Sequence, residues 1–301
     1  MMSRPLSLPL FVACAAVAAS SGFAQGRPST DVWIVPMTAA GSVPTFGAPV
    51  NATHRTGYDN QPSFSAKGDA LFYTVIGADA QADIWRIALP DGAPKQMTRT
   101  TESEYSATIT PDGTTYSVIR VEADSTQRLW RFPLDGNGAP TVVLEKIKPV
   151  GYHLWTGDHQ LVLFVLGARG APSTLQLADE RTGTAEIITE NIGRALGKVP
   201  GRDAVTFLQQ VKDSVSWITE LDLRTKKTRR LMQPPAGAEY HVWTPGGALL
   251  AAAGSRIYLW NNGRWDVAAE FERFGVKNAS RLAVSPRGNW LAFVAEDKPS
   301  P

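Results

Sequence analysis

The sequence predicts an all-β protein, a six-bladed β-propeller of four-stranded blades whose last blade is closed by strands from both termini. Three observations predict this fold class. A strand–turn–strand unit recurs along the chain, a second strand marker follows inside each unit, and the two ends carry complementary parts of one unit. Because a single unit of this size cannot bury its own apolar face, the units are expected to pack side by side.

The first 24 residues are predicted to be a cleavable secretory signal peptide. Arg4 is the only charged residue before an apolar stretch over residues 6–19, and Gly22 and Ala24 put small residues where a signal peptidase reads. We therefore expect residues 25–301 to form one propeller domain in the periplasm or outside the cell. The alternative is a lipoprotein anchored through Cys14, which the continuation of the apolar stretch past Cys14 disfavours.

The recurring unit is a strand, a tight turn and a second strand. Proline presets the first turn position, glycine accepts a positive φ, and the following residues alternate with the strand period of two. The clearest copies are residues 62–73, 109–116 and 284–293, and weaker copies occupy 155–163, 200–207 and 243–250. The first apolar residue after each turn recurs every 41 to 45 residues, at Leu71, Tyr116, Leu161, Val205, Leu250 and Leu291.

A second marker, an apolar or aromatic strand, follows each unit about a dozen residues later. It occurs at 83–89, 129–134, 174–177, 216–221 and 257–260, and a turn then leads into a short fourth strand such as 95–98 or 142–144. Four strands per unit at this period are typical of propeller blades. The last copy stops after two strands near Glu296, and the strand at Trp33 begins with the third, so the two ends together predict the sixth blade without an open edge.

Composition excludes several partners. The 30 Lys and Arg against 28 Asp and Glu give a net charge of +2 with no basic run, so neither nucleic acid nor an anionic membrane surface is expected. A single cysteine cannot build a disulfide framework or a multi-cysteine metal site. No stretch after the signal approaches the ~20 apolar residues of a membrane span.

The sequence resembles the TolB-like β-propeller repeats of exported bacterial proteins. Pro62, Phe64, Gly68 and the tripeptide Asp83-Ile84-Trp85 match the repeat, as do the turns at 110–113 and 285–288. The resemblance implies the propeller fold, an exported location and a binding role on one face of the ring. TolB itself carries a separate α/β domain ahead of its propeller, for which this chain leaves no room before Trp33, so the resemblance does not imply the full Tol-complex function.

The sequence has no Gly-x-Ser-x-Gly elbow, His-Glu-x-x-His pair or Walker loop. We therefore expect a monomeric, non-catalytic binding or scaffold module for an envelope protein or peptide, with no catalytic residue and no cofactor. Loops on a rigid ring concentrate binding residues around the channel mouth. The residues expected there are Asn60, Glu104, Tyr105, His153, Arg194, His241 and Asn278.

The alternative is a calcium-dependent hydrolase, lactonase-like or esterase-like, that uses the same channel mouth. Calcium takes six to eight oxygen ligands. Only Asp59, Asn60, Glu104 and Asn278 are good ligands among the candidates, and Arg194 places a cation in the ring. His153 and His241 share one repeat position, but no third histidine joins them, so we expect packed, hydrogen-bonded histidines and no metal site.

Overall fold

The computed structural model describes residues 29–38, 43–211 and 215–296. The predicted signal peptide and the alternative lipid anchor at Cys14 lie outside these ranges. Within them, no helix has the length and apolar character that crossing a membrane would require. The same ranges contain no α-helix, and a short 3-10 turn at Glu272–Phe274 (η2) interrupts an otherwise all-β chain.

Four of the sheets have four strands each and follow the chain in order. The first contains β8 (Ser103–Ile109), β9 (Thr115–Val121), β10 (Gln127–Pro133) and β11 (Thr141–Val142). The second contains β12 (Val150–Trp155), β13 (Gln160–Val165), β14 (Thr174–Asp179) and β15 (Thr184–Glu190). The third contains β16 (Ile192–Lys198), β17 (Ala204–Gln210), β18 (Ser216–Asp222) and β19 (Thr228–Met232). The fourth contains β20 (His241–Trp243), β21 (Leu249–Ala253), β22 (Arg256–Asn261) and β23 (Arg264–Glu270).

The remaining strands join the two ends of the described chain. Their order is β24 (Ser280–Val284), β25 (Trp290–Glu296), β1 (Thr30–Thr38), β4 (Tyr58–Phe64), β5 (Ala70–Ile76), β6 (Ala82–Ala88) and β7 (Lys95–Gln96). The short strands β2 (Thr45–Phe46) and β3 (Val50–Asn51) also pair with β1. β1 runs antiparallel to β25 from Thr30↔Glu296 to Pro36↔Trp290, whereas it meets β4 only at the parallel pair Thr30↔Tyr58.

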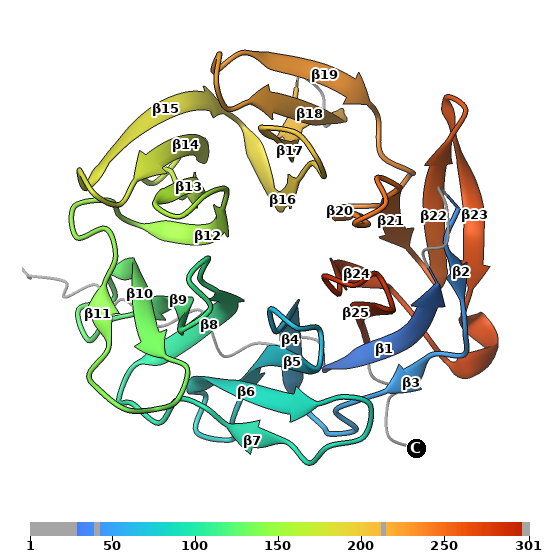
Figure 1. Ribbon diagram of the computed structural model, residues 1–301, viewed down its shortest axis with the longest axis horizontal. Coiled ribbons are helices and arrows are strands. Elements are labelled where there is room, and N and C mark those ends of the chain that lie inside the picture. Colours follow the sequence, from blue (N-terminus) through green and yellow to red (C-terminus); the bar gives the residue numbers. More distant parts are fainter. Residues whose placement is uncertain (1–28, 39–42, 212–214, 297–301) are drawn as a thin grey trace, which may run out of the picture.

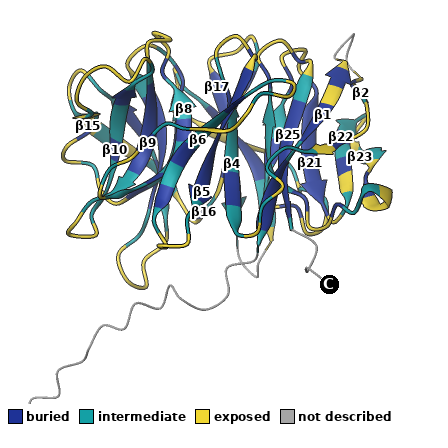
Figure 2. Ribbon diagram, turned by 90° about the horizontal axis from the view of Figure 1, so that it is seen from below, coloured by how far each residue is buried: buried dark blue, intermediate teal, exposed yellow. Residues whose placement is uncertain are grey.

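The sheets stand around a central space (Figure 1), with β4, β8, β12, β16, β20 and β24 nearest the centre. The predicted all-β class and its four-stranded sheets are therefore confirmed, in an arrangement consistent with a β-propeller. The second strand of each sheet contains a run of at least four buried residues, as in Leu249–Ala253, where every residue is buried. Neighbouring sheets cover both of its faces, and Figure 2 shows the exposed residues concentrated in the loops at the two ends of the strands.

Candidate functional site in the central channel

Bulges in several of the innermost strands direct side chains toward the channel. The pairing of β4 with β5 shifts between Asn60 and Ser63, and a non-glycine residue, Gln61, sits there with φ 57°. Ser106 in β8 (φ 56°) and Arg281 in β24 (φ 49°) occupy the same kind of irregularity. An extra residue in a strand re-aims its side chain, and left-handed backbone outside glycine is costly, so these positions are functional candidates.

One repeat position supplies the bulge residues Gln61, Ser106 and Arg281, and also Tyr152, which follows the bulge of β12, and Tyr240, which immediately precedes β20. Each lies four residues before the Ser or Thr that begins the tight turn. The backbone amide of that Ser or Thr forms a hydrogen bond across the turn. These turn residues are Ser65, Thr110, Thr156, Thr244 and Ser285. The residues at this position are Gln61, Ser106, Tyr152, Tyr240 and Arg281. In β16 the irregularity is longer, between Ile192 and Leu196, and both Arg194 and Ala195 reach the channel.

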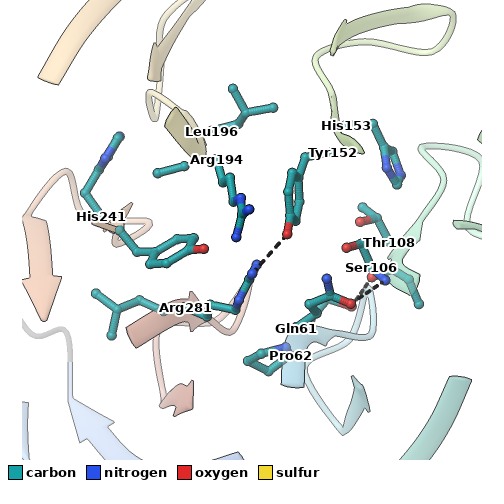
Figure 3. A pocket seen from close by; sticks show the side chains of 15 residues that line it. Gln61, Pro62, Ser106, Thr108, Tyr152, His153, Arg194, Leu196, His241 and Arg281 are labelled. Carbon is teal, nitrogen blue, oxygen red and sulfur yellow. Dashed lines mark hydrogen bonds between the residues drawn. The ribbon is translucent and has the colours of Figure 1, made fainter. Parts of the chain in front are cut away.

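These side chains enclose a cavity of about 150 Å³ (Figure 3). Its lining comes from the six innermost strands and the residue before β20. No aspartate or glutamate is among the lining residues. Among the polar side chains around it, the two arginines carry a positive charge, and the others are neutral groups that can each donate a hydrogen bond.

Arg281 is held between two tyrosines. Its Nη2 donates a hydrogen bond to Tyr152 Oη at 2.9 Å, as drawn in Figure 3. Its guanidinium carbon lies 5.3 Å from the centre of the Tyr152 ring and 4.8 Å from that of Tyr240, within cation–π range. Burial alone would lower the pKa of Arg281, but the oxygens of Tyr152 and Tyr240 outweigh it and raise the pKa, so the group stays charged.

Arg194 and Gln61 offer donors that the protein does not use. Arg194 is exposed, and no ion pair or hydrogen bond involves its guanidinium within the described ranges. Gln61 Oε1 accepts hydrogen bonds from Thr74 Oγ1 at 2.8 Å and from the Ser106 amide at 3.1 Å, and its Nε2 has no hydrogen bond to another described residue. The Ser106 hydroxyl is buried and has no partner among the described residues. The cavity thus presents free donors from several strands.

His153 and His241 belong to the packing between sheets. His153 Nε2 shares a hydrogen bond with Ser117 Oγ at 2.7 Å, and the same oxygen accepts one from Trp155 Nε1 at 2.9 Å. Burial lowers the pKa of His153 to about 3 and that of His241 to about 4, so both rings are neutral. Both residues border the cavity, but Figure 3 shows their rings directed away from its centre. The second copy of this cluster contains His241, Trp243 and Thr206, with both nitrogens 2.9 Å from Thr206 Oγ1.

Three of the predicted site residues, His153, Arg194 and His241, border the cavity, and four do not. Asn60 is buried and donates to Thr30 Oγ1 at 3.3 Å. Glu104 is fully buried, where its Oε1 accepts from Thr100 Oγ1 and lies 3.3 Å from Arg120 Nε. Tyr105 packs against the core beside Leu129 and Leu161, and Asn278 is exposed before β24.

Sequence reasoning missed Gln61, Ser106, Tyr152, Tyr240 and Arg281 because it placed the site one to three residues away. An extra residue at a bulge exchanges the side chains that face the channel with those that face the neighbouring sheet. The signal that could have found them is the constant offset of four residues from the Ser or Thr of the turn.

No family model matches the sequence, and no curated protein matches it. Among solved structures, a protein described as a putative TolB from Agrobacterium tumefaciens superposes with a TM-score of 0.71 at 15% identity, covering 91% of this chain and 100% of its own. TolB from Acinetobacter baumannii superposes with a TM-score of 0.58 at 10% identity, covering 90% of this chain and 65% of its own. The fold is a TolB-like β-propeller.

The TolB-like propeller also resembles a gluconolactonase from Xanthomonas campestris, with a TM-score of 0.62 at 10% identity over 91% of this chain and 96% of the other. At such identities the likeness concerns the fold, and the chemistry must be read from the site. Within the described ranges, no group of three or more His, Cys, Asp or Glu side chains is placed to hold a metal ion. The cavity lining has no carboxylate and includes two arginines, so it does not fit Ca²⁺, which takes six to eight oxygen ligands.

Proposed function

We propose that this chain is an exported, non-catalytic binding module, and that its ligand is an envelope protein or peptide bound at the channel cavity. In this proposal the propeller has six blades: the four separate sheets, the β4–β7 strands, and a blade made of β24, β25, β1 and its short partners. The observation that carries the binding role is the cavity itself. It has unused donors from several strands and no acidic group.

The channel residues of this proposal are Gln61, Ser106, Tyr152, Arg194, Tyr240 and Arg281. They come from strands that are far apart in sequence, and Figure 1 places those strands around one centre. A rigid ring that brings such side chains together suits recognition, because little ordering is left to be done on binding. The exported location rests on the signal-peptide pattern of residues 1–24, and the first residue of the mature protein, from N-terminal sequencing, tests it.

The second candidate is a hydrolase, favoured by the likeness to a gluconolactonase. The 2.7 Å contact of Ser117 with His153 has the spacing of a nucleophile and its base. Ser117 is fully buried, however, and its oxygen already accepts a hydrogen bond from Trp155. Ser106, which does reach the cavity, has no histidine bonded to it in the described chain. The cavity therefore supports binding better than catalysis.

Site-directed photo-crosslinking tests the binding role. A photoreactive residue is placed at Glu239, which is exposed beside Tyr240, and for comparison at Val267, which is 53% exposed on the outer strand β23. We expect one envelope polypeptide to be captured in cells from position 239 and not from position 267. Equal capture from both positions, or turnover of gluconolactone or simple esters by the purified protein, would contradict the proposal.

A further inference from the structure

We infer that the channel cavity is a carboxylate-binding site, which takes the C-terminal carboxylate or an acidic side chain of a peptide. This inference rests on the proposed function and names the chemical group that the ligand presents. It is carried by the charge, the preorganisation and the size of the cavity.

The charge of the cavity is uncompensated. Arg194 and Arg281 are both close enough to Tyr240 that each lowers its pKa, although burial raises the pKa overall. Neither arginine forms an ion pair in the described chain, whereas the partly buried Arg120 and Arg131 do. Glu239 is the one carboxylate that acts on Tyr240, and it is exposed and outside the lining. The missing counter-charge is what a bound anion would supply.

The two arginines have different roles. Arg281 is fixed by Tyr152 and by the two aromatic rings, so part of its donor set is already used. Arg194 keeps all its donors, and a free guanidinium presents a planar pair that matches the two oxygens of a carboxylate. The free guanidinium of Arg194, with the fixed Arg281 beside it, suits a carboxylate with one negative charge. A phosphate dianion would need both guanidinium groups to be free.

The remaining polar groups also suit an acceptor-only ligand. Gln61 Nε2 has no partner, and no hydrogen bond engages Tyr240 Oη within the described ranges. Ser106 adds a buried hydroxyl that nothing in the described chain satisfies. An ionised carboxylate has only acceptors, so each of these donors would find a partner on it. A cavity of about 150 Å³ holds such a group and a few attached atoms, which is the end or one side chain of a peptide.

Calorimetric titration of the mature chain with short peptides tests this assignment. The probes are N-acetyl-tetraalanine with a free carboxylate, its C-terminal amide, an N-acetylated and amidated peptide with one central aspartate, and inorganic phosphate. We expect the free acid, the aspartate peptide or both to bind at least roughly tenfold more tightly than the amide, because hydrogen bonds to a charged group are stronger than those to a neutral one. The first and third probes distinguish a chain end from a side chain.

Substitutions locate the site. Arg194→Gln should weaken binding of the carboxylate peptide by roughly tenfold or more. Arg264→Gln removes the same charge from an exposed position on β23 and should leave binding unchanged. Because Arg281→Gln could disturb folding, Tyr240→Phe, which removes only a hydroxyl, serves as the second variant and should weaken binding less than Arg194→Gln.

Several results would overturn the inference. They are equal binding of the acid and the amide, binding that Arg194→Gln leaves unchanged, and tighter binding of phosphate than of either carboxylate probe. The crosslink from Glu239 separates this failure from that of the proposed function. A crosslinked partner without carboxylate binding removes only the inference, whereas carboxylate binding without a partner removes only the protein-binding role.

Discussion

At the level of single residues, the His and the Trp of each Tyr-His-x-Trp segment, at 152–155 and 240–243, share one hydroxyl as their hydrogen-bond partner. Ser117 and Thr206 each satisfy an indole and an imidazole that reach across from the next sheet. Each hydroxyl also lies within 3.2 to 3.3 Å of a carbonyl oxygen in its own sheet, Thr108 or Gly197. One small side chain therefore ties three strands together.

Removing that hydroxyl should be costly. Thr206→Val keeps the shape of the side chain but leaves Trp243 Nε1 and His241 Nε2 buried without a partner, which costs about 1–3 kcal/mol for each unsatisfied group. Thr206→Ser, which reproduces the residue found at position 117, should cost less. Urea unfolding of the two variants measures the difference. Equal loss of stability would mean that the hydroxyl is not the connecting group.

Buried titratable residues should make stability respond to pH in opposing ways. His153 and His241 are neutral when folded, because burial lowers their pKa values to about 3 and about 4, so stability falls as pH drops from 6.5 and the unfolded chain takes up protons. Burial raises the pKa of Asp59 to about 6 and of Glu104 to about 7. These carboxyls bind protons more tightly when folded, so they contribute stability that is lost as pH rises through those values.

The two effects overlap between about pH 4.5 and 6.5 and should partly cancel in the wild type. The double variant Asp59→Asn, Glu104→Gln removes the two largest opposing carboxyl effects, so stability should fall more steeply on acidification. Chemical unfolding at several pH values within this window gives the slope. Asp135→Asn, at an exposed turn, is the control and should keep the wild-type slope. An unchanged slope in the double variant would contradict the assignment.

The identity of the channel residues was only partly predictable. Arg194 is in the predicted set because it lies where the chain leads into an innermost strand. The set contains His153 and His241 and not the tyrosines before them, since alternation along a strand does not indicate which of two neighbouring residues faces the channel. Bulges arise from the fit of neighbouring strands, which the local sequence does not report.

At the scale of elements, three of the innermost strands, β4, β8 and β24, combine extended backbone with one left-handed residue. Ser106 has φ 56°, a conformation that costs a β-branched residue much more than glycine. Ser106→Gly should therefore be more stable than Ser106→Val by roughly 1–3 kcal/mol. At Thr108, the next position after the bulge in register with β9, the order should reverse, because valine suits regular strand better than glycine. Thermal unfolding of the four variants checks this, and the same order at both positions would contradict it.

The strands themselves were more predictable than the bulges. The turns at 65–70, 110–115 and 285–290 depend on local Pro, Gly and Ser or Thr chemistry, and the strands on either side formed where the pattern indicated. The weaker copies of the turn, at 155–163, 200–207 and 243–250, each lie in a four-stranded sheet of the same design, β12 to β15, β16 to β19 and β20 to β23. There the tertiary packing of buried runs such as Leu161–Val165 maintains the fold in the absence of strong turn signals.

For the whole molecule, the pairing of β1 with β25 links residues from opposite ends of the chain. Deleting residues 280–301 would remove β24 and β25, leave the edge of β1 that faces β25 unpaired along Thr30–Pro36, and expose Val35 and Met37, which now pack in one cluster with Leu291 and Phe293. We expect unfolding or aggregation, since an unpaired apolar edge invites association. Size-exclusion chromatography and thermal melting measure it. A truncated chain that remains monomeric with an unchanged Tm would show that this pairing is dispensable.

Because of the same pairing, the two ends of the described chain lie next to each other, so the chain could begin at another loop without changing which strands are neighbours. Thr30 and Glu296 are Cα partners, and partners across antiparallel strands are about 5 Å apart. A short Gly-Ser linker could therefore join these two positions, and a new break at the exposed Arg181–Gly183 turn between β14 and β15 would give a circular permutant with every strand pair retained. In such a permutant the β25–β1 connection becomes an ordinary hairpin, which converts a long-range contact into a local one.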